Sequence, residues 1–412
     1  METSIQKNRV FIWGIVVFSF VVGLIHRLSM GALAESLVRE LNYSGSMLGF
    51  LSSATLYAYA IMQIPAGFLV DWLGVRKVCG AGLVLTALGS ILFASTSVLS
   101  IAIMGRILVG VGTSGMMLSA FKLQTELFEE KKFPALSGIT SCCGNVGVLL
   151  AMSPFALLVN SMGWRESYYL VSAITLVLAV IVFIVVPKSD KVQLLSLKEA
   201  FNRIKTVIVN PKTWPPFGIL FTMMGVMTIF NGLWGIPYIM HVYGVDNVVA
   251  SRLLSMIPIG FIICGPLIGR VCDKLKGGVR QASILGSVLM ASLMAVLVIF
   301  GAKPPIGVMP VIFVLMGIAG LTHILAFTKA KEVTALTLSG IVTAVVNMGE
   351  FIGSSILGPT FGFILDRGWQ GQIVNDSRIY SAQSYTIVFA IATILCIGTV
   401  YCSIKLKKTT NN

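Results

Sequence analysis

The chain has 412 residues and a formal net charge of +14, with 56% hydrophobic residues, 11% charged residues and a mean hydropathy of +0.91. Soluble globular domains carry about 25% charged residues, so this composition excludes a water-soluble enzyme. It also excludes an intrinsically disordered chain, which needs low hydrophobicity, and a membrane β-barrel, whose alternating segments are only about 10 residues long.

Apolar windows of about 20 residues, long enough to cross a bilayer as helices, recur along the chain. We predict twelve such spans, in chain order 10–34, 46–71, 78–98, 100–126, 134–159, 167–187, 215–241, 250–272, 282–301, 307–328, 336–366 and 380–404. The first is too long for the apolar region of a cleavable signal peptide. We therefore expect an all-α membrane protein with twelve transmembrane helices.

The longest connection between spans is 188–214. It carries six basic residues and an apolar stripe at helical spacing, so we expect an amphipathic linker that lies on the membrane surface. This linker divides the chain into an N-terminal bundle, 1–187, and a C-terminal bundle, 215–412, of six spans each.

The basic residues predict the orientation of the chain. With an inside N-terminus, 21 of the 30 Lys and Arg residues fall on the inner side, and those on the outer side are Arg39, Arg165, Arg252, Lys303, Arg367 and Arg378. The positive-inside rule then places both termini in the cytoplasm and explains the net charge without nucleic-acid binding. We expect a bacterial inner membrane protein, since no sorting signal is evident.

Related motifs occur after the second and the eighth span, at matching places in the two halves. The first copy contains Gly67, Asp71, Gly74 and Arg76, and the second contains Gly269, Asp273 and Arg280. The first glycine of each copy would allow close helix approach, and the aspartate at a helix end could meet a facing helix N-terminus and the arginine of the turn. We predict a conformational gate, in a duplicated arrangement typical of transporters.

The loop from Gly67 to Lys77 resembles motif A of the major facilitator superfamily, with Trp72 where that motif usually has Arg. The segment Arg106–Gly112 resembles its motif B, R-x-x-x-G-x-G. The likeness covers nearly the whole chain. It implies two pseudo-symmetric six-helix bundles about a central cavity, alternating access, function as a monomer in the lipid bilayer, no cofactor, and a proton or sodium gradient as the driving force.

Within that superfamily, Arg27 followed by the segment 63–67 looks most like the organic-anion symporter branches. An aspartate often precedes the arginine in those branches, whereas His26 stands there in this chain. Polar side chains inside spans are functional candidates because their burial in lipid is unfavourable. A guanidinium at Arg27 could hold a carboxylate through two hydrogen bonds, or it could reach back to the outer membrane interface.

Further substrate-binding candidates are polar or aromatic side chains within spans, namely Lys122, Asn231, Trp234, Tyr238, Tyr57 and Gln63. Lys122 could instead form an i,i+4 ion pair with Glu126. Asn231 to Tyr238 include glycines and a proline, and broken helices of this kind often line transporter sites, although packing alone could explain the pattern.

Three residues are candidates for proton coupling. Glu350 is a carboxylate deep within the span 336–366, and an isolated carboxylate in a dry site can carry a proton. His26 could titrate near neutral pH or simply form hydrogen bonds. Arg106 is assigned a structural and coupling role by the motif B resemblance.

We expect a secondary active transporter of a small organic anion, coupled to protons. The alternatives are an exporter of drugs, metabolites or a siderophore, an importer of amino acids or nucleosides, and, from another class, a membrane enzyme or a receptor that does not transport. No P-loop, H-E-x-x-H, G-x-S-x-G or C-x-x-C motif is present, so we expect neither catalysis nor a metal site. The seven cysteines fall in or beside apolar segments and are interpreted as small buried residues.

Overall fold

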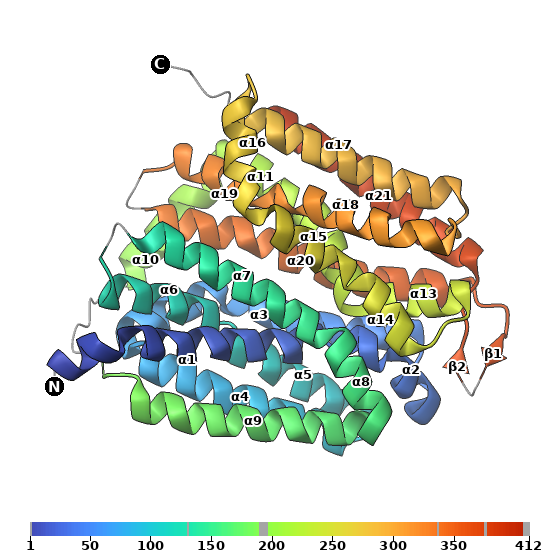
Figure 1. The fold of residues 1–412 in the computed structure, drawn as a ribbon, viewed down its shortest axis with the longest axis horizontal. Coiled ribbons are helices and arrows are strands. Elements are labelled where there is room, and N and C mark those ends of the chain that lie inside the picture. Colours follow the sequence, from blue (N-terminus) through green and yellow to red (C-terminus); the bar gives the residue numbers. More distant parts are fainter. Residues whose placement is uncertain (1, 130–131, 189–196, 336–337, 375–376, 407–412) are drawn as a thin grey trace. The chain divides into compact units, whose positions relative to one another are not determined.

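The computed structural model describes residues 2–129, 132–188, 197–335, 338–374 and 377–406 (Figure 1). Twelve helical segments within them are long and apolar enough to cross a membrane, which confirms the predicted number. They are Asn8–Leu41, Gly45–Leu73, Val75–Ser95, Leu99–Leu127, Leu136–Met162, Trp164–Val185, Pro211–Tyr243, Asn247–Cys264, Gly278–Ile299, Ile306–Glu332, Gly340–Arg367 and Ala382–Lys405.

Packing separates the chain into two compact units. The first unit is Met1–Ser29 with Ala54–Leu195, and the second is Met30–Ser53 with Ser196–Asn412. The C-terminal part of the first predicted span and the beginning of the second therefore pack with C-terminal helices. The predicted bundle boundary at 188–214 stays a prediction, and residues 189–196 of that linker lie outside the described residues.

The described residues of the first unit form helices and no strands. These helices are α1 (Glu2–Leu28), most of α3 (Gly45–Leu73), α4 (Val75–Ser95), α5 (Leu99–Thr113), α6 (Met116–Leu127), α7 (Phe133–Ala151), α8 (Ser153–Met162) and α9 (Trp164–Val185). Helix α4 packs between α5 and α9, and α1 packs against α6 and α7 (Figure 1). A Cβ added at Gly89 would lie 2.6 Å from the Gly105 carbonyl oxygen, so α4 and α5 approach backbone to backbone.

The second unit contains the remaining elements. They are α2 (Met30–Leu41), the start of α3, α10 (Leu197–Val209), η2 (Pro211–Thr213), α11 (Trp214–Ile219), η3 (Leu220–Met224), α12 (Gly225–Ile229), η4 (Phe230–Trp234), α13 (Gly235–Tyr243), α14 (Asn247–Leu254), α15 (Met256–Cys264), η5 (Gly265–Leu267), α16 (Ile268–Lys274), α17 (Gly278–Ile299), η6 (Ile306–Val308), α18 (Met309–Leu321), α19 (His323–Glu332), α20 (Ser339–Arg367), β1 (Ile373–Val374), β2 (Ser377–Arg378) and α21 (Ala382–Lys405).

Helix pairs organise this second unit. Helix α17 packs along α21 and α18, while α15 packs against α18 (Figure 1). The strands β1 and β2 form a short antiparallel hairpin before α21, an addition to the predicted all-α architecture. Two turns of the seventh span, η3 and η4, are π-helical, which fits the irregularity predicted from its glycines and proline.

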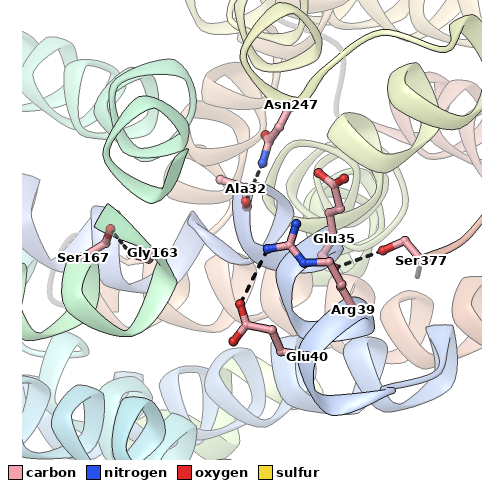
Figure 2. Close-up of polar contacts among 8 residues, drawn as sticks. All are labelled: Ala32, Glu35, Arg39, Glu40, Gly163, Ser167, Asn247 and Ser377. Atoms are coloured by element: carbon pink, nitrogen blue, oxygen red, sulfur yellow. Dashed lines mark hydrogen bonds and ion pairs between the residues drawn. The ribbon is translucent and has the colours of Figure 1, made fainter. Parts of the chain in front are cut away.

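The second unit also holds α2 and the beginning of α3. The Asn247 amide donates to the Ala32 carbonyl at 2.8 Å, and the Ser377 hydroxyl donates to the Glu35 carbonyl at 3.2 Å (Figure 2). Both bonds use backbone carbonyls of α2, so they attach the helix without depending on its side chains.

Glycines on two helices make the start of α3 lie directly against α20. Gly45 and Gly49 stand four residues apart on α3, and Gly358 and Gly362 stand four residues apart on α20. A Cβ added at Gly49 would lie 2.6 Å from the Pro359 Cα, and one added at Gly362 would overlap the Gly45 carbonyl. Small residues at this spacing permit backbone contact between membrane helices.

Candidate functional site

Arg106 on α5 caps the C-terminal end of α1, which stops at Leu28 just before α2 begins. Its Nη1 donates to the His26 carbonyl at 2.8 Å, and its Nη2 donates to the Arg27 carbonyl at 3.4 Å. These carbonyls belong to the last turn of α1, where helix carbonyls lack intrahelical partners and carry partial negative charge. Arg106 is fully buried and forms no ion pair with a described residue. The structural role predicted from its motif therefore has a concrete basis.

His26 is held at both ring nitrogens by hydroxyl groups. Its Nε2 lies 2.8 Å from the Thr175 Oγ on α9, and its Nδ1 lies 2.7 Å from the Ser90 Oγ on α4. The Thr175 hydroxyl also donates to the Val171 carbonyl, so Nε2 is the donor towards Thr175, and Ser90 can donate to Nδ1. A neutral imidazole satisfies this network. Proton coupling by His26 stays a prediction, and the network describes a link between three helices.

Arg27 lies near the middle of the first helical segment, about 4 Å from its midpoint at the usual helical rise. The side chain is buried, and its Cζ lies 4.2 Å from the centre of the Tyr59 ring on α3. Gln63 is one helical turn beyond Tyr59 on the same face of α3 and is also buried. Its Nε2 has no hydrogen-bond partner among the described residues. Tyr57, a further substrate-binding candidate, is partly exposed.

In the second unit, Glu350 on α20 meets the seventh span. Its Oε1 accepts a hydrogen bond from the Thr228 hydroxyl on α12 at 2.6 Å. Asn231 lies in the π-helical turn η4, and its Oδ1 is buried without a hydrogen-bond partner among the described residues. Glu350 and Asn231 are thus polar groups within apolar spans, as predicted, and both belong to one compact unit.

Two aromatic candidates of the seventh span pack inside the second unit. The Tyr238 hydroxyl donates to the Ala302 carbonyl at 2.8 Å, and the ring contacts Tyr385 and Phe389. Trp234 donates from Nε1 to the Gly358 carbonyl at 3.3 Å. Neither side chain has more than a trace of exposed surface. Tertiary neighbours cover both rings and use their donors, which fits the packing alternative, and substrate binding by Trp234 and Tyr238 stays a prediction.

The first copy of the predicted gate contains an ion pair that differs from the expected ones. The Nζ of Lys122 lies 2.8 Å from Asp71 Oδ1, with both side chains partly exposed. Lys122 was expected to bind substrate or to pair with Glu126, and Asp71 was expected to meet Arg76 or a helix N-terminus. The structure adds the contact between Lys122 on α6 and Asp71, while substrate binding by Lys122 and the gating role of Asp71 stay predictions.

Glycines at the two copies of the gate have different roles. Gly74 has φ of 80° and caps the start of α4, so it makes the turn between α3 and α4. A Cβ added at Gly67 or Gly269 would meet no atom within 4 Å. Close helix approach at these two glycines, which the repeat predicts, is therefore absent from the described residues.

The second copy of the gate contains no counterpart of the Lys122 pair. Asp273 is exposed and forms no ion pair with the residues that the structure describes. Arg280 donates from Nη2 at 2.6 Å and from Nε at 3.2 Å to the Ile404 carbonyl in the last turn of α21. The Arg280 side chain therefore caps the C-terminal end of α21. The gating role of these residues stays a prediction.

Asp366, at the end of α20, is a polar centre that the sequence analysis missed. Its Oδ1 accepts from the Gly45 backbone N–H and the Tyr380 hydroxyl, both at 2.8 Å. Its Oδ2 accepts from the Ser46 backbone N–H at 2.7 Å and the Ser46 hydroxyl at 2.6 Å. Burial and the charge of Asp366 raise the pKa of Tyr380, so its hydroxyl remains a donor.

Cys79, Cys272 and Cys396 are buried as predicted, whereas Cys142 is exposed and the other three cysteines are partly buried, so the prediction that all seven are buried is wrong. Among the described residues, no group of three or more His, Cys, Asp and Glu side chains is arranged to hold a metal ion.

Comparison with known proteins places the chain in a family. The "Probable L-galactonate transporter" of Escherichia coli (strain K12) is 24% identical over 390 residues, covering 89% of this chain and 85% of that protein. The "Probable sulfoacetate transporter SauU" of Cupriavidus necator is 22% identical over 381 residues, covering 88% of each. A bacterial homologue of the human lysosomal transporter Spinster has a similar fold, with a TM-score of 0.76 at 14% identity over 96% of both chains.

A family model described as Major Facilitator Superfamily matches residues 15–359. The predicted resemblance to this superfamily is thereby confirmed, together with the all-α architecture of twelve spans. The chain belongs to the Major Facilitator Superfamily and is a multi-pass membrane transporter, not an enzyme.

Proposed function

We propose that this transporter moves a small organic anion carrying a carboxylate, by alternating access and with proton coupling. The observation that carries the proposal is the buried guanidinium of Arg27 on the face of the Tyr59 ring. A desolvated cation–π contact contributes about 2 kcal/mol and leaves the guanidinium charged. A negatively charged substrate would add a further favourable interaction.

The geometry around Arg27 suits a carboxylate. An aromatic ring contacts a guanidinium through its flat face, whereas carboxylates bind its N–H edge through two parallel hydrogen bonds. The two contacts are therefore compatible at one arginine. Gln63, on the same face of α3 as Tyr59, has a buried amide nitrogen without a partner among the described residues, and it could donate to a substrate hydroxyl or carboxylate.

The relatives support the same class of substrate. Galactonate and sulfoacetate, which appear in the names of two of them, are both small organic anions. At 24% and 22% identity these relatives indicate a chemical class and not a particular compound.

We assign proton coupling to Glu350. A carboxylate within a membrane span is unfavourable when charged, and protonation removes that charge. The Thr228 hydroxyl, 2.6 Å from Oε1, stabilises the charged form by donating a hydrogen bond. The hydrogen bond from Thr228 on α12 is therefore stronger when Glu350 is charged than when it is protonated. Protonation of Glu350 would thus weaken the contact between α12 and α20 within the second unit. We also propose that both termini are cytoplasmic, that the membrane is a bacterial inner membrane and that the monomer is functional.

Uptake into proteoliposomes tests both assignments. The panel contains radiolabelled sugar acids, sulfonates, dicarboxylates, amino acids and nucleosides, with and without an inward proton gradient. We expect accumulation of an acid in the presence of the gradient, and its loss in Arg27→Ala. Arg39→Ala, which changes an exposed arginine of the same helical segment, is the matched control and should transport normally.

Glu350→Gln should abolish gradient-driven accumulation and retain exchange of labelled for unlabelled substrate. Glu129→Gln removes an exposed carboxylate and serves as its control. Normal transport of an acid by Arg27→Ala would refute the role of Arg27. Transport of neutral solutes only, or outward pumping of lipophilic compounds, would refute the anion proposal and favour the importer or exporter alternatives.

A further inference from the structure

A cavity of about 500 Å³ opens in the second unit, where three spans end. The seventh span begins there, and the tenth and twelfth spans finish there. Its lining includes the lysines Lys212, Lys329 and Lys405 and the aromatic residues Trp214 and Tyr401, while the other lining residues are prolines, aliphatic residues and one cysteine. No lining residue is acidic, so the walls combine positive charge with apolar surface.

The three lysines give the cavity a net positive charge. Lys329 is buried, and its Nζ lies 2.7 Å from Glu332 Oε2. Lys405 lies 5.5 Å from the centre of the Tyr401 ring. Lys212 and Lys405 form no ion pair with the residues that the structure describes. The Glu332 carboxylate compensates one of the three ammonium groups, so two uncompensated positive charges remain at the cavity.

The cavity borders a lipid-facing surface. Trp214 and Tyr401 are exposed at the ends of their spans, and such aromatic residues are enriched at the membrane–water interface. Along α21, Ile394, Ile397 and Ile404 are exposed at helical spacing beside Tyr401. A molecule in the cavity could therefore place an anionic group on the lysines and an apolar chain along α21.

We propose that this cavity binds the headgroup of an anionic phospholipid, with its phosphate on Lys212 and Lys405 and its acyl chains against the exposed face of α21. Basic pockets between membrane helices have the charge that such headgroups require. The volume falls within the range of about 300–1,000 Å³ that is usual for ligand pockets. The lipid-facing isoleucines favour a lipid over a soluble phosphate. None of the residues assigned to substrate or to protons lines the cavity.

Contact between the lipid and Trp214 can be measured directly. The full-length protein is reconstituted into phosphatidylcholine vesicles with increasing fractions of phosphatidylglycerol brominated on its acyl chains, since bromine quenches tryptophan fluorescence on contact. The chain has six tryptophans, so the difference from Trp214→Phe isolates the signal at the cavity. We expect this signal to be quenched at a much lower fraction of brominated phosphatidylglycerol than of brominated phosphatidylcholine.

The midpoint of this titration is the fraction of brominated phosphatidylglycerol that gives half-maximal quenching. The double variant Lys212→Gln with Lys405→Gln should raise this midpoint by about 30-fold, since each basic residue near an anionic lipid surface contributes about 1 kcal/mol. The matched control is Lys274→Gln with Lys276→Gln, which removes two exposed lysines elsewhere in the same unit and should leave the midpoint unchanged. Equal quenching by both lipids, or equal weakening in both double variants, would overturn the proposal. Displacement of the lipid by millimolar inorganic phosphate would reassign the site to a soluble phosphate.

Discussion

The carboxylate of Asp366 satisfies the first two backbone N–H groups of α3, and removing its charge should release that end of the helix. Ser44 accepts from the Met47 N–H at 3.3 Å, while Gly45 and Ser46 donate to Asp366. In Asp366→Asn, one oxygen is replaced by an amide that cannot accept. The start of α3 then loses one hydrogen bond, which costs about 0.5–1.5 kcal/mol because the Gly45 N–H keeps the Tyr380 hydroxyl as an acceptor at 2.9 Å, and the lost charge at the helix N-terminus costs about 0.3–1 kcal/mol.

These terms amount to about 2 kcal/mol, which corresponds to about 30-fold more frequent opening of the first turns of α3. Hydrogen–deuterium exchange reports this equilibrium directly when reclosing is fast. In the purified protein, the peptide covering residues 42–53 of Asp366→Asn should exchange about 30-fold faster than in the parent protein. The first unit should be unaffected at residues distant from α3.

Asp246→Ala is the matched control for this experiment. Asp246 caps α14 through a single bond to the Val249 N–H at 2.8 Å, which alanine removes, so this substitution should accelerate exchange in α14 alone. Unchanged exchange at the start of α3 in Asp366→Asn, with a normal response of α14 in the control, would refute the reasoning. That result would mean that glycine packing alone holds this end of α3.

Two further outcomes follow from the first unit. Arg106→Met leaves the His26 and Arg27 carbonyls without their donor and should lower the free energy of unfolding in detergent by about 3 kcal/mol. The control Arg39→Met changes an exposed arginine and should lower it by less than about 0.5 kcal/mol. Equal effects of the two substitutions would contradict this account. Lys122→Gln breaks a partly exposed ion pair and should change unfolding by less than about 1 kcal/mol, so a loss above about 2 kcal/mol in the same assay would contradict a surface pair.

The twelve spans were predictable because hydrophobic length is a local property of the sequence. The break between α1 and α2 at Ser29 could not be predicted, because Arg106, which is distant in the sequence, binds the carbonyls freed there. The break before α8 differs in this respect, because Pro154 marks it locally.

Positions of candidate residues were easier to predict than their partners. The histidine was identified, but Ser90 and Thr175 lie 64 and 149 residues from His26. For Lys122 the sequence offered Glu126 at helical spacing, whereas tertiary packing supplies Asp71. Tyr238 could not be recognised as buried, because α21 provides the rings that cover it.

Asp366 had one local signal that was overlooked. The start of α3, Ser44-Gly45-Ser46, offers a single side-chain cap for a helix whose first N–H groups all need acceptors. A further acceptor at this helix start was therefore predictable, although only the fold identifies Asp366 as the group that supplies it.

The glycine contact between α3 and α20 determines how the attraction between these two helices changes when they separate. Gly45 and Gly49 meet Gly358 and Gly362 through backbone atoms, without side chains that could stretch or follow a retreating partner. Dispersion attraction loses a quarter to a half of its strength when a gap widens by about 0.5–1 Å. Because these backbone atoms touch directly, a separation of less than about 1 Å removes much of the attraction between the two helices at the glycines, where no side chain can change rotamer to keep contact.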